Sequence, residues 1–178
     1  MWVYGLNCKP TLIENRKLAS KQTIMQYSFT TVWHVMSGIE PVWQAINDVE
    51  QWPQWWPGVN KVEQLKPGGV GQINVLTWKS ILPYTLKFKA TITEVRTHKL
   101  ITAQATGELE GSGQWVFEQL AGNQTKLTYY WQVRTTKMWM NLLAPLAFIF
   151  RYNHHVVMNW GGKGLGQKLG CKVEVSHL

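Results

Sequence analysis

The chain has 178 residues, of which 45% are hydrophobic and 16% are charged, and its net charge is +8. This length and composition fit one globular domain with room for a core and a cavity, and they exclude a disordered chain. The basic balance would suit a nucleic acid or an anionic membrane, but the cations are scattered and accompany no RNA-binding consensus, zinc-finger spacing or basic helix. We therefore expect no nucleic-acid partner.

Two cysteines, Cys8 and Cys171, lie near opposite ends of the sequence. Two isolated thiols do not make a disulfide framework, which favours a reducing compartment. The first residues also lack the basic start, apolar run and small-residue cleavage site of a signal peptide. These features predict a cytoplasmic protein.

Residues 1–25 mix polar, basic and apolar residues without a clear period, which indicates an extension ahead of the folded unit. We expect the domain to span residues 26–170, although the folded unit could begin at Met25. Residues 171–178 are expected to form a C-terminal tail.

The first strand is predicted from about Tyr27 to Val35. Its large residues recur at every second position, which is the period of a strand with one buried face. That face would carry Tyr27, Phe29, Thr31, Trp33 and Val35.

A tryptophan-rich stretch follows, in residues 41–57. Pro41 suits the first turn of a helix, and the apolar residues after it recur at helical spacing. Pro53 must open a second short helix or break the first. The stretch is therefore predicted to form two short helices that turn indole faces toward a hollow or flat neighbour.

Six further strands are predicted, and turn signals separate several of them. Ala121, Gly122 and Asn123 form a hairpin signal between the last two. The default for such a series is sequential antiparallel pairing, which gives a seven-stranded sheet with the first strand. The six segments are residues 60–66, 71–78, 84–93, 99–106, 111–120 and 125–134.

A long C-terminal helix is predicted to start near Pro145 and to end at about Leu169. Its apolar residues lie three or four apart, so they form one stripe that should face the sheet. Five glycines weaken its later turns, which predicts either fraying or a need for small residues close to a neighbour. The stripe contains Ala147, Phe150, His154, Val157, Gly161, Leu165 and Leu169.

The order of these elements, with a Trp-Pro-x-Trp-Trp segment at residues 52–56, is similar to that of a known family. The chain resembles the polyketide cyclase/dehydrase and lipid-transport family of the START-like superfamily. Segments 111–117, 125–131 and 153–158 agree with it, and the resemblance covers about residues 26–169. It implies an α+β helix-grip fold, in which a curved antiparallel sheet wraps around the C-terminal helix and the two short helices follow the first strand.

Such a sheet is wider than a helix, so a cavity should remain between them. The number of aromatic residues on inward strand faces exceeds what is needed to pack one helix, which favours an apolar ligand pocket. The predicted ligand-binding residues are Trp33, Trp56, Trp78, Phe88, Trp115, Phe117, Tyr129, Trp131, Phe150, Asn153, His154, Val157 and Met158.

His154 is the candidate catalytic residue, because it lies on the stripe that should face the cavity. Its ring is either a hydrogen-bonded core group, a polar contact for a ligand, or a proton-transfer group. No zinc-binding helix, nucleophile elbow or phosphate-binding glycine loop occurs in the sequence. We expect no metal site and no cofactor.

Three functions follow from these features. The first is binding of a hydrophobic or aromatic small molecule, lipid or polyketide-like, in the internal cavity. The second is a cyclase or dehydratase in which His154 moves a proton. The third is a membrane-docking lipid-transfer protein, because the apolar run of residues 138–150 is too short to span a bilayer but could touch one transiently. The sequence leaves the ligand and the oligomeric state open.

Overall fold

The computed structural model describes residues 26–79, 83–136 and 147–178. The expected extension, residues 1–25, lies outside the described residues. The helices within these described residues are α1 (Ile39–Asn47), the 3₁₀-helix η1 (Val49–Gln51), α2 (Trp52–Trp55) and α4 (Ala147–Leu169). The strands are β1 (Gln26–Val35), β2 (Val59–Lys66), β3 (Ile73–Lys79), β4 (Thr85–Arg96), β5 (Leu100–Gly107), β6 (Leu109–Leu120), β7 (Gln124–Thr135) and β8 (Val173–His177).

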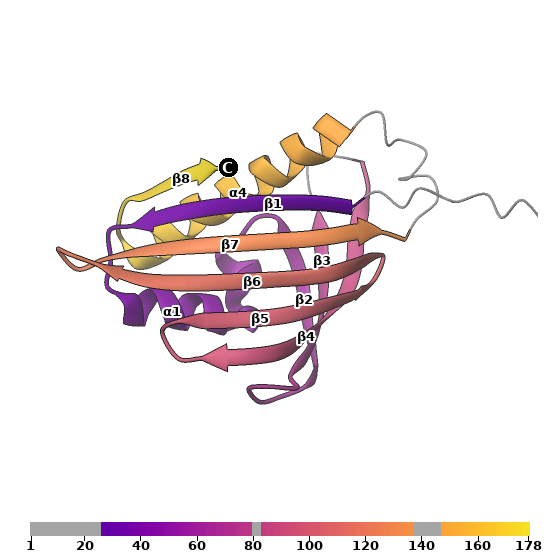
Figure 1. The fold of residues 1–178 in the computed structure, drawn as a ribbon, viewed down its shortest axis with the longest axis horizontal. Coiled ribbons are helices and arrows are strands. Elements are labelled where there is room, and N and C mark those ends of the chain that lie inside the picture. The colour runs from indigo at the N-terminus through magenta and orange to yellow at the C-terminus, as the bar shows by residue number, and fades with distance from the viewer. Residues whose placement is uncertain (1–25, 80–82, 137–146) are drawn as a thin grey trace, which may run out of the picture.

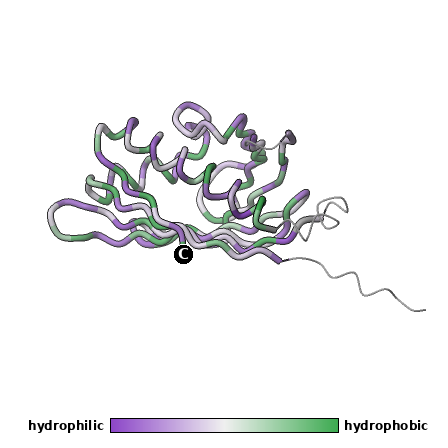
Figure 2. The backbone as a smooth tube through the Cα atoms, turned by 90° about the horizontal axis from the view of Figure 1, so that it is seen from above, coloured by the Kyte–Doolittle hydropathy of each residue, from purple (hydrophilic) through white to green (hydrophobic). Residues whose placement is uncertain are grey.

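The strands form one antiparallel sheet in the order β2-β3-β4-β5-β6-β7-β1-β8 (Figure 1). Figure 2 shows the helices together on one side of this sheet. The predicted α+β helix-grip fold is thereby confirmed, with the two short helices after the first strand and the long helix near the C-terminus.

The predicted number of seven strands is wrong, because the sheet formed by the described residues contains eight. The additional strand, β8, lies within residues 171–178, which we expected to form a tail. It pairs with β1, with Val175 opposite Trp33 and His177 opposite Thr31. Five residues that find their partner on a strand about 140 positions earlier give little local signal.

Prolines and glycines set the local geometry as expected. Pro53 occupies the first turn of α2, where its missing N–H has no helical partner to lose. Gly122 and Asn123 both have positive φ, 70° and 56°, as a tight hairpin turn between β6 and β7 requires.

The glycines of α4 allow close contact, and the helix continues regularly to Leu169. A Cβ on Gly161 would lie 2.4 Å from the Trp56 ring, and one on Gly164 would lie 1.7 Å from the carbonyl oxygen of Trp55. Both distances are far below van der Waals contact. The absence of side chains here lets α4 pack directly on α2.

Candidate functional site

A cavity of about 130 Å³ lies between the sheet and α4. Its walls are mainly aromatic rings contributed by β1, the central strands, α2 and α4. Most of the residues predicted to line a cavity do so: Trp56, Trp78, Phe88, Trp115, Tyr129, Trp131, Phe150, Asn153, His154, Val157 and Met158.

Neighbouring strands β6 and β7 build the aromatic floor. Trp115 pairs in register with Tyr129, and their rings stack with centroids 4.2 Å apart. Trp131 lies opposite Gly113, where a Cβ would come within 2.9 Å of the indole. Gly113 therefore leaves the space across which the Trp131 ring lies.

Trp52 of α2 and Trp56, the residue that follows α2, form another wall. The Trp56 side chain is 1% exposed and donates its indole N–H to the carbonyl oxygen of Val157 over 2.9 Å. Its ring also meets Trp78 edge to face, with centroids 5.1 Å apart. This combination of packing and hydrogen bonding fixes α2 against both α4 and β3.

Trp33 and Phe117, which we expected in the cavity wall, lie outside its lining. The Trp33 ring packs between those of Trp56 and Trp115, with centroids 5.3 and 5.4 Å away. Phe117 packs on Trp43 of α1, with centroids 4.9 Å apart. Both residues are on the inward face, but they lie toward the end of the sheet that the short helices fill.

A second cavity of about 80 Å³ adjoins the first. The two share walls formed by aromatic rings of α2, β3, β4, β6 and β7. Beyond these rings the second cavity is lined largely by aliphatic residues of β3, β4 and β5, including Leu76, Ile92 and Ile101. The interior therefore passes from an aromatic compartment to an aliphatic one.

Sequence reasoning missed several residues of the cavity wall, among them Tyr27, Phe29, Trp52, Lys79 and Tyr84. The alternation of β1 carried the signal for the first two, since they share a face with Thr31. Nothing in the local pattern identified Lys79 as the charged side chain among the described lining residues.

Three buried polar atoms of the cavity wall have no hydrogen-bond partner among the described residues: Tyr27 Oη, Trp78 Nε1 and Asn153 Oδ1. Trp78 Nε1 is a donor, Asn153 Oδ1 is an acceptor, and Tyr27 Oη can act as either. Burial raises the pKa of Tyr27, and it raises the pKa of Tyr84 to about 12. At neutral pH both phenols are therefore protonated and present O–H groups.

His154 lies on α4 with its ring stacked on Phe29, the two centroids being 4.3 Å apart. Its Nε2 lies 3.4 Å from Oγ1 of Thr31. Burial, and then the neighbouring His155 and His177, lower the pKa of His154 to about 3. The ring is therefore neutral at physiological pH and offers one donor and one acceptor nitrogen.

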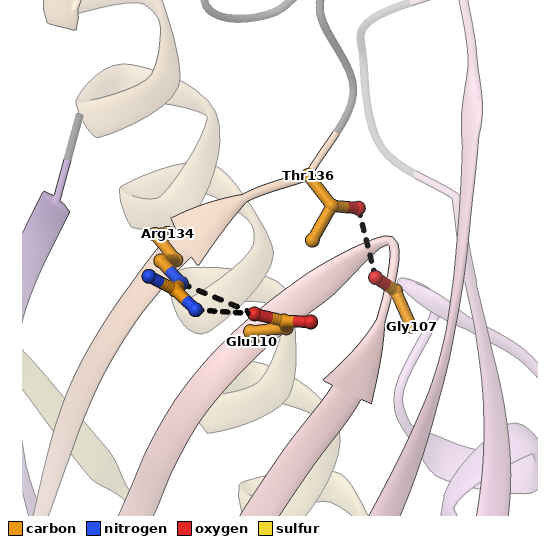
Figure 3. A network of polar contacts seen from close by, with 4 residues as sticks. All are labelled: Gly107, Glu110, Arg134 and Thr136. Atoms are coloured by element: carbon orange, nitrogen blue, oxygen red, sulfur yellow. Dashed lines mark hydrogen bonds and ion pairs between the residues drawn. The ribbon is translucent and has the colours of Figure 1, made fainter. Parts of the chain in front are cut away.

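Polar contacts fix the sheet at the ends of β5, β6 and β7 (Figure 3). Arg134 pairs with Glu110 over 2.8 Å, and Thr136 donates its hydroxyl hydrogen to the carbonyl oxygen of Gly107 over 2.8 Å. Leu109 and Val133, each adjacent to one member of the ion pair, line the cavity. These contacts therefore lie beside one end of the cavity.

The apolar run expected to touch a membrane falls mostly outside the described residues, which resume at Ala147. Phe148 and Tyr152, at the start of α4, are 65% and 61% exposed. No helix in the described part of the chain is long and apolar enough to cross a bilayer.

Residues 39–151 match the model of a family described as polyketide cyclase / dehydrase and lipid transport. No curated protein matches the chain.

Solved structures share the fold at low sequence identity. The ZhuI aromatase/cyclase from Streptomyces sp. R1128 is 18% identical, with a TM-score of 0.56 over 64% of this chain and 70% of that one. A START superfamily protein from Mycobacterium smegmatis is 16% identical, with a TM-score of 0.60 over 82% of this chain and 97% of that one.

A third structure is the di-domain aromatase/cyclase BexL of the BE-7585A biosynthetic pathway, which is 16% identical, with a TM-score of 0.59. The match covers 79% of this chain and 48% of BexL, so it spans about half the length of that protein.

Proposed function

The chain belongs to the polyketide cyclase/dehydrase and lipid transport family, and on that premise we propose that it binds a small aromatic or apolar molecule that carries oxygen groups. The ligand would occupy the aromatic cavity between the sheet and α4.

The observation that carries this proposal is an aromatic cavity with unpartnered polar atoms in its wall. A buried polar atom without a partner costs about 1–3 kcal/mol, which a ligand group of matching polarity recovers. Tyr27 Oη and Trp78 Nε1 would each donate to a ligand oxygen, and Asn153 Oδ1 would accept from a hydroxyl. A plain hydrocarbon would leave all three atoms unpaired.

The size of the cavity supports a ligand built on one or two rings. Its volume of about 130 Å³ is close to the roughly 150 Å³ of an engineered apolar cavity that admits benzene. The adjoining cavity of about 80 Å³ leaves space for a second ring or a short chain.

An enzymatic function is the second candidate, because neutral His154 lies in the cavity wall with one nitrogen held by Thr31. In a cyclase or dehydratase, the shaped cavity would fold a polyketide-like substrate and His154 would move a proton. Two solved structures with this fold are described as aromatase/cyclases.

Fluorescence titration with phenols and naphthols of one or two rings and with short fatty acids tests the binding proposal, since bound ligands should quench the tryptophans of the wall. For a hydroxylated ligand, Tyr27→Phe should weaken affinity about 3- to 10-fold, the value of one hydrogen bond. Tyr130→Phe is the matched control, because Tyr130 is 43% exposed and absent from the cavity wall.

Absence of binding below about 1 mM across the panel would contradict the proposal. Chromatography of the same mixtures distinguishes a binding protein from an enzyme. Consumption of a ligand by the wild type but not by His154→Leu would favour the enzyme.

A further inference from the structure

A chain of hydrogen bonds connects the outer side of α4 to His154 in the cavity wall. His177 Nε2 lies 3.1 Å from Asn159 Oδ1, and His177 Nδ1 lies 3.2 Å from Thr31 Oγ1. The same Thr31 oxygen lies 3.4 Å from His154 Nε2. Three elements, α4, β8 and β1, thus contribute to one connected path.

The fold places these groups together by strand register. His177 is the last residue of β8 and pairs directly with Thr31 of β1. Thr31 is 1% exposed, so its hydroxyl has little access to water and depends on these two imidazoles for hydrogen bonds. His155 stacks on His177, with ring centroids 4.0 Å apart, and limits the orientations of the His177 ring.

The donor in each hydrogen bond follows from Asn159, at the outer end of this series. Asn159 presents its amide oxygen, which only accepts, so Nε2 of neutral His177 must carry the hydrogen. Its Nδ1 then has only a lone pair, and the Thr31 hydroxyl must donate to it. The Thr31 oxygen is left to accept, and therefore Nε2 of His154 donates.

This order fixes the state of the second ring nitrogen of His154. A neutral imidazole that carries its hydrogen on Nε2 has a lone pair on Nδ1. Nδ1 has no hydrogen-bond partner among the described residues, while His154 belongs to the cavity wall. No described residue therefore uses this lone pair.

We propose that His177 and Asn159, acting through Thr31, are positioning residues that hold His154 in its Nε2–H form so that Nδ1 accepts a hydrogen bond from a ligand hydroxyl. This inference rests on the proposed function and narrows it to ligands that donate a hydrogen bond, such as phenols or alcohols. Stacking on Phe29 holds the plane of the His154 ring. The relay, by which we mean the hydrogen bonds from Asn159 through His177 and Thr31 to His154, sets which ring nitrogen carries the hydrogen.

The tautomer of His154 can be measured without a ligand, from imidazole ¹⁵N chemical shifts of the full-length protein at pH 7. We expect Nε2–H in the wild type and a mixture of both tautomers in His177→Phe and Asn159→Leu. Asn159→Asp, recorded at pH 9 so that His177 stays neutral beside the carboxylate, should retain Nε2–H, because a carboxylate only accepts. His155→Phe should also retain it, since His155 stacks beside the relay without entering it.

Asn159 is exposed, so its variants report on the relay even if His177→Phe folds poorly. An Nδ1–H tautomer in the wild type would overturn the proposal. So would a tautomer unchanged in both His177→Phe and Asn159→Leu.

Binding of 2-naphthol and 2-methylnaphthalene tests whether Nδ1 of His154 accepts a hydrogen bond from a ligand hydroxyl. The two probes have nearly the same shape and differ in the hydroxyl. Asn159→Leu should weaken 2-naphthol about 3- to 5-fold and leave 2-methylnaphthalene unchanged. Equal weakening of both probes would overturn the assigned role of Nδ1. If the wild type bound neither probe, the proposed function and the ligand contact of His154 Nδ1 would both fail. The ¹⁵N spectrum would still decide whether His177 and Asn159 set the tautomer of His154.

Discussion

The indole N–H of Trp56 donates to the carbonyl oxygen of Val157 over 2.9 Å, which joins α2 directly to α4. Both residues line the aromatic cavity. The contact between the short helices and the long helix is therefore part of the cavity wall, and stability and the shape of the cavity depend on the same side chain.

Trp56→Phe should lower the free energy of unfolding by about 2–3 kcal/mol. It removes the hydrogen bond and leaves a gap where the larger ring packed. Urea denaturation of the two proteins measures the difference. Exposed Tyr152→Phe is the control, and a change below about 0.5 kcal/mol in Trp56→Phe would mean that the helices are joined mainly by other contacts.

Gly161→Ala should destabilise the protein, although alanine is the better helix former by about 1 kcal/mol. The new Cβ would lie 2.4 Å from the Trp56 ring, so the ring or the helix must move. Overpacking of this kind costs about 1–3 kcal/mol. Lys163→Ala, at an exposed position of the same helix, should be nearly neutral, and stabilisation by Gly161→Ala would show that α4 is not packed tightly on α2.

Tyr27→Phe should leave stability unchanged or raise it by up to about 1 kcal/mol, because the buried hydroxyl has no partner among the described residues. Thermal unfolding of the ligand-free protein measures this. A loss above about 1 kcal/mol would show that the hydroxyl is satisfied in the folded protein and is not kept for a ligand.

Stability should fall as the solution is acidified from about pH 6.5 toward pH 3. The pKa of His154 is lowered from an ordinary value near 6.5 to about 3, chiefly by burial. In this window the unfolded chain binds a proton at His154 and the folded protein does not, so protonation favours unfolding. Between pH 7 and pH 4 the cost is about 3 kcal/mol.

Denaturation of wild type and His154→Phe at both pH values isolates this contribution. The variant should lose about 3 kcal/mol less than the wild type on acidification. The pKa values of His155 and His177 are also lowered, so the variant should retain part of the dependence. Equal losses in the two proteins would mean that the folded protein protonates His154 readily.

The sequence predicted the fold well, because the signals for its main elements are local. The alternation along β1 and the helical spacing around Val42 each identify an element and its buried face. The same alternation did not place Trp33 and Phe117 correctly. A period of two gives the face of a strand, but it does not show where the short helices fill the space above that face.

The hydrogen bonds that connect Asn159, His177 and Thr31 to His154 could not be predicted from the sequence, for a related reason. His177 approaches Thr31 only because β8 pairs with β1, and the two residues are 146 positions apart. His154 itself was found from its position on the apolar stripe of α4. A helical period identifies the residue that faces the cavity, whereas its hydrogen-bond partners depend on long-range register.

Native mass spectrometry of the protein purified from its own host tests the central claim most directly, namely that the cavity holds a small molecule. We predict one co-purifying apolar molecule per chain, with a mass that fits one or two rings carrying oxygen. Val133→Trp, which places a larger ring at a buried position of the cavity wall, should abolish it. A wild-type protein without any bound molecule, and without affinity for the tested ligands, would contradict the account.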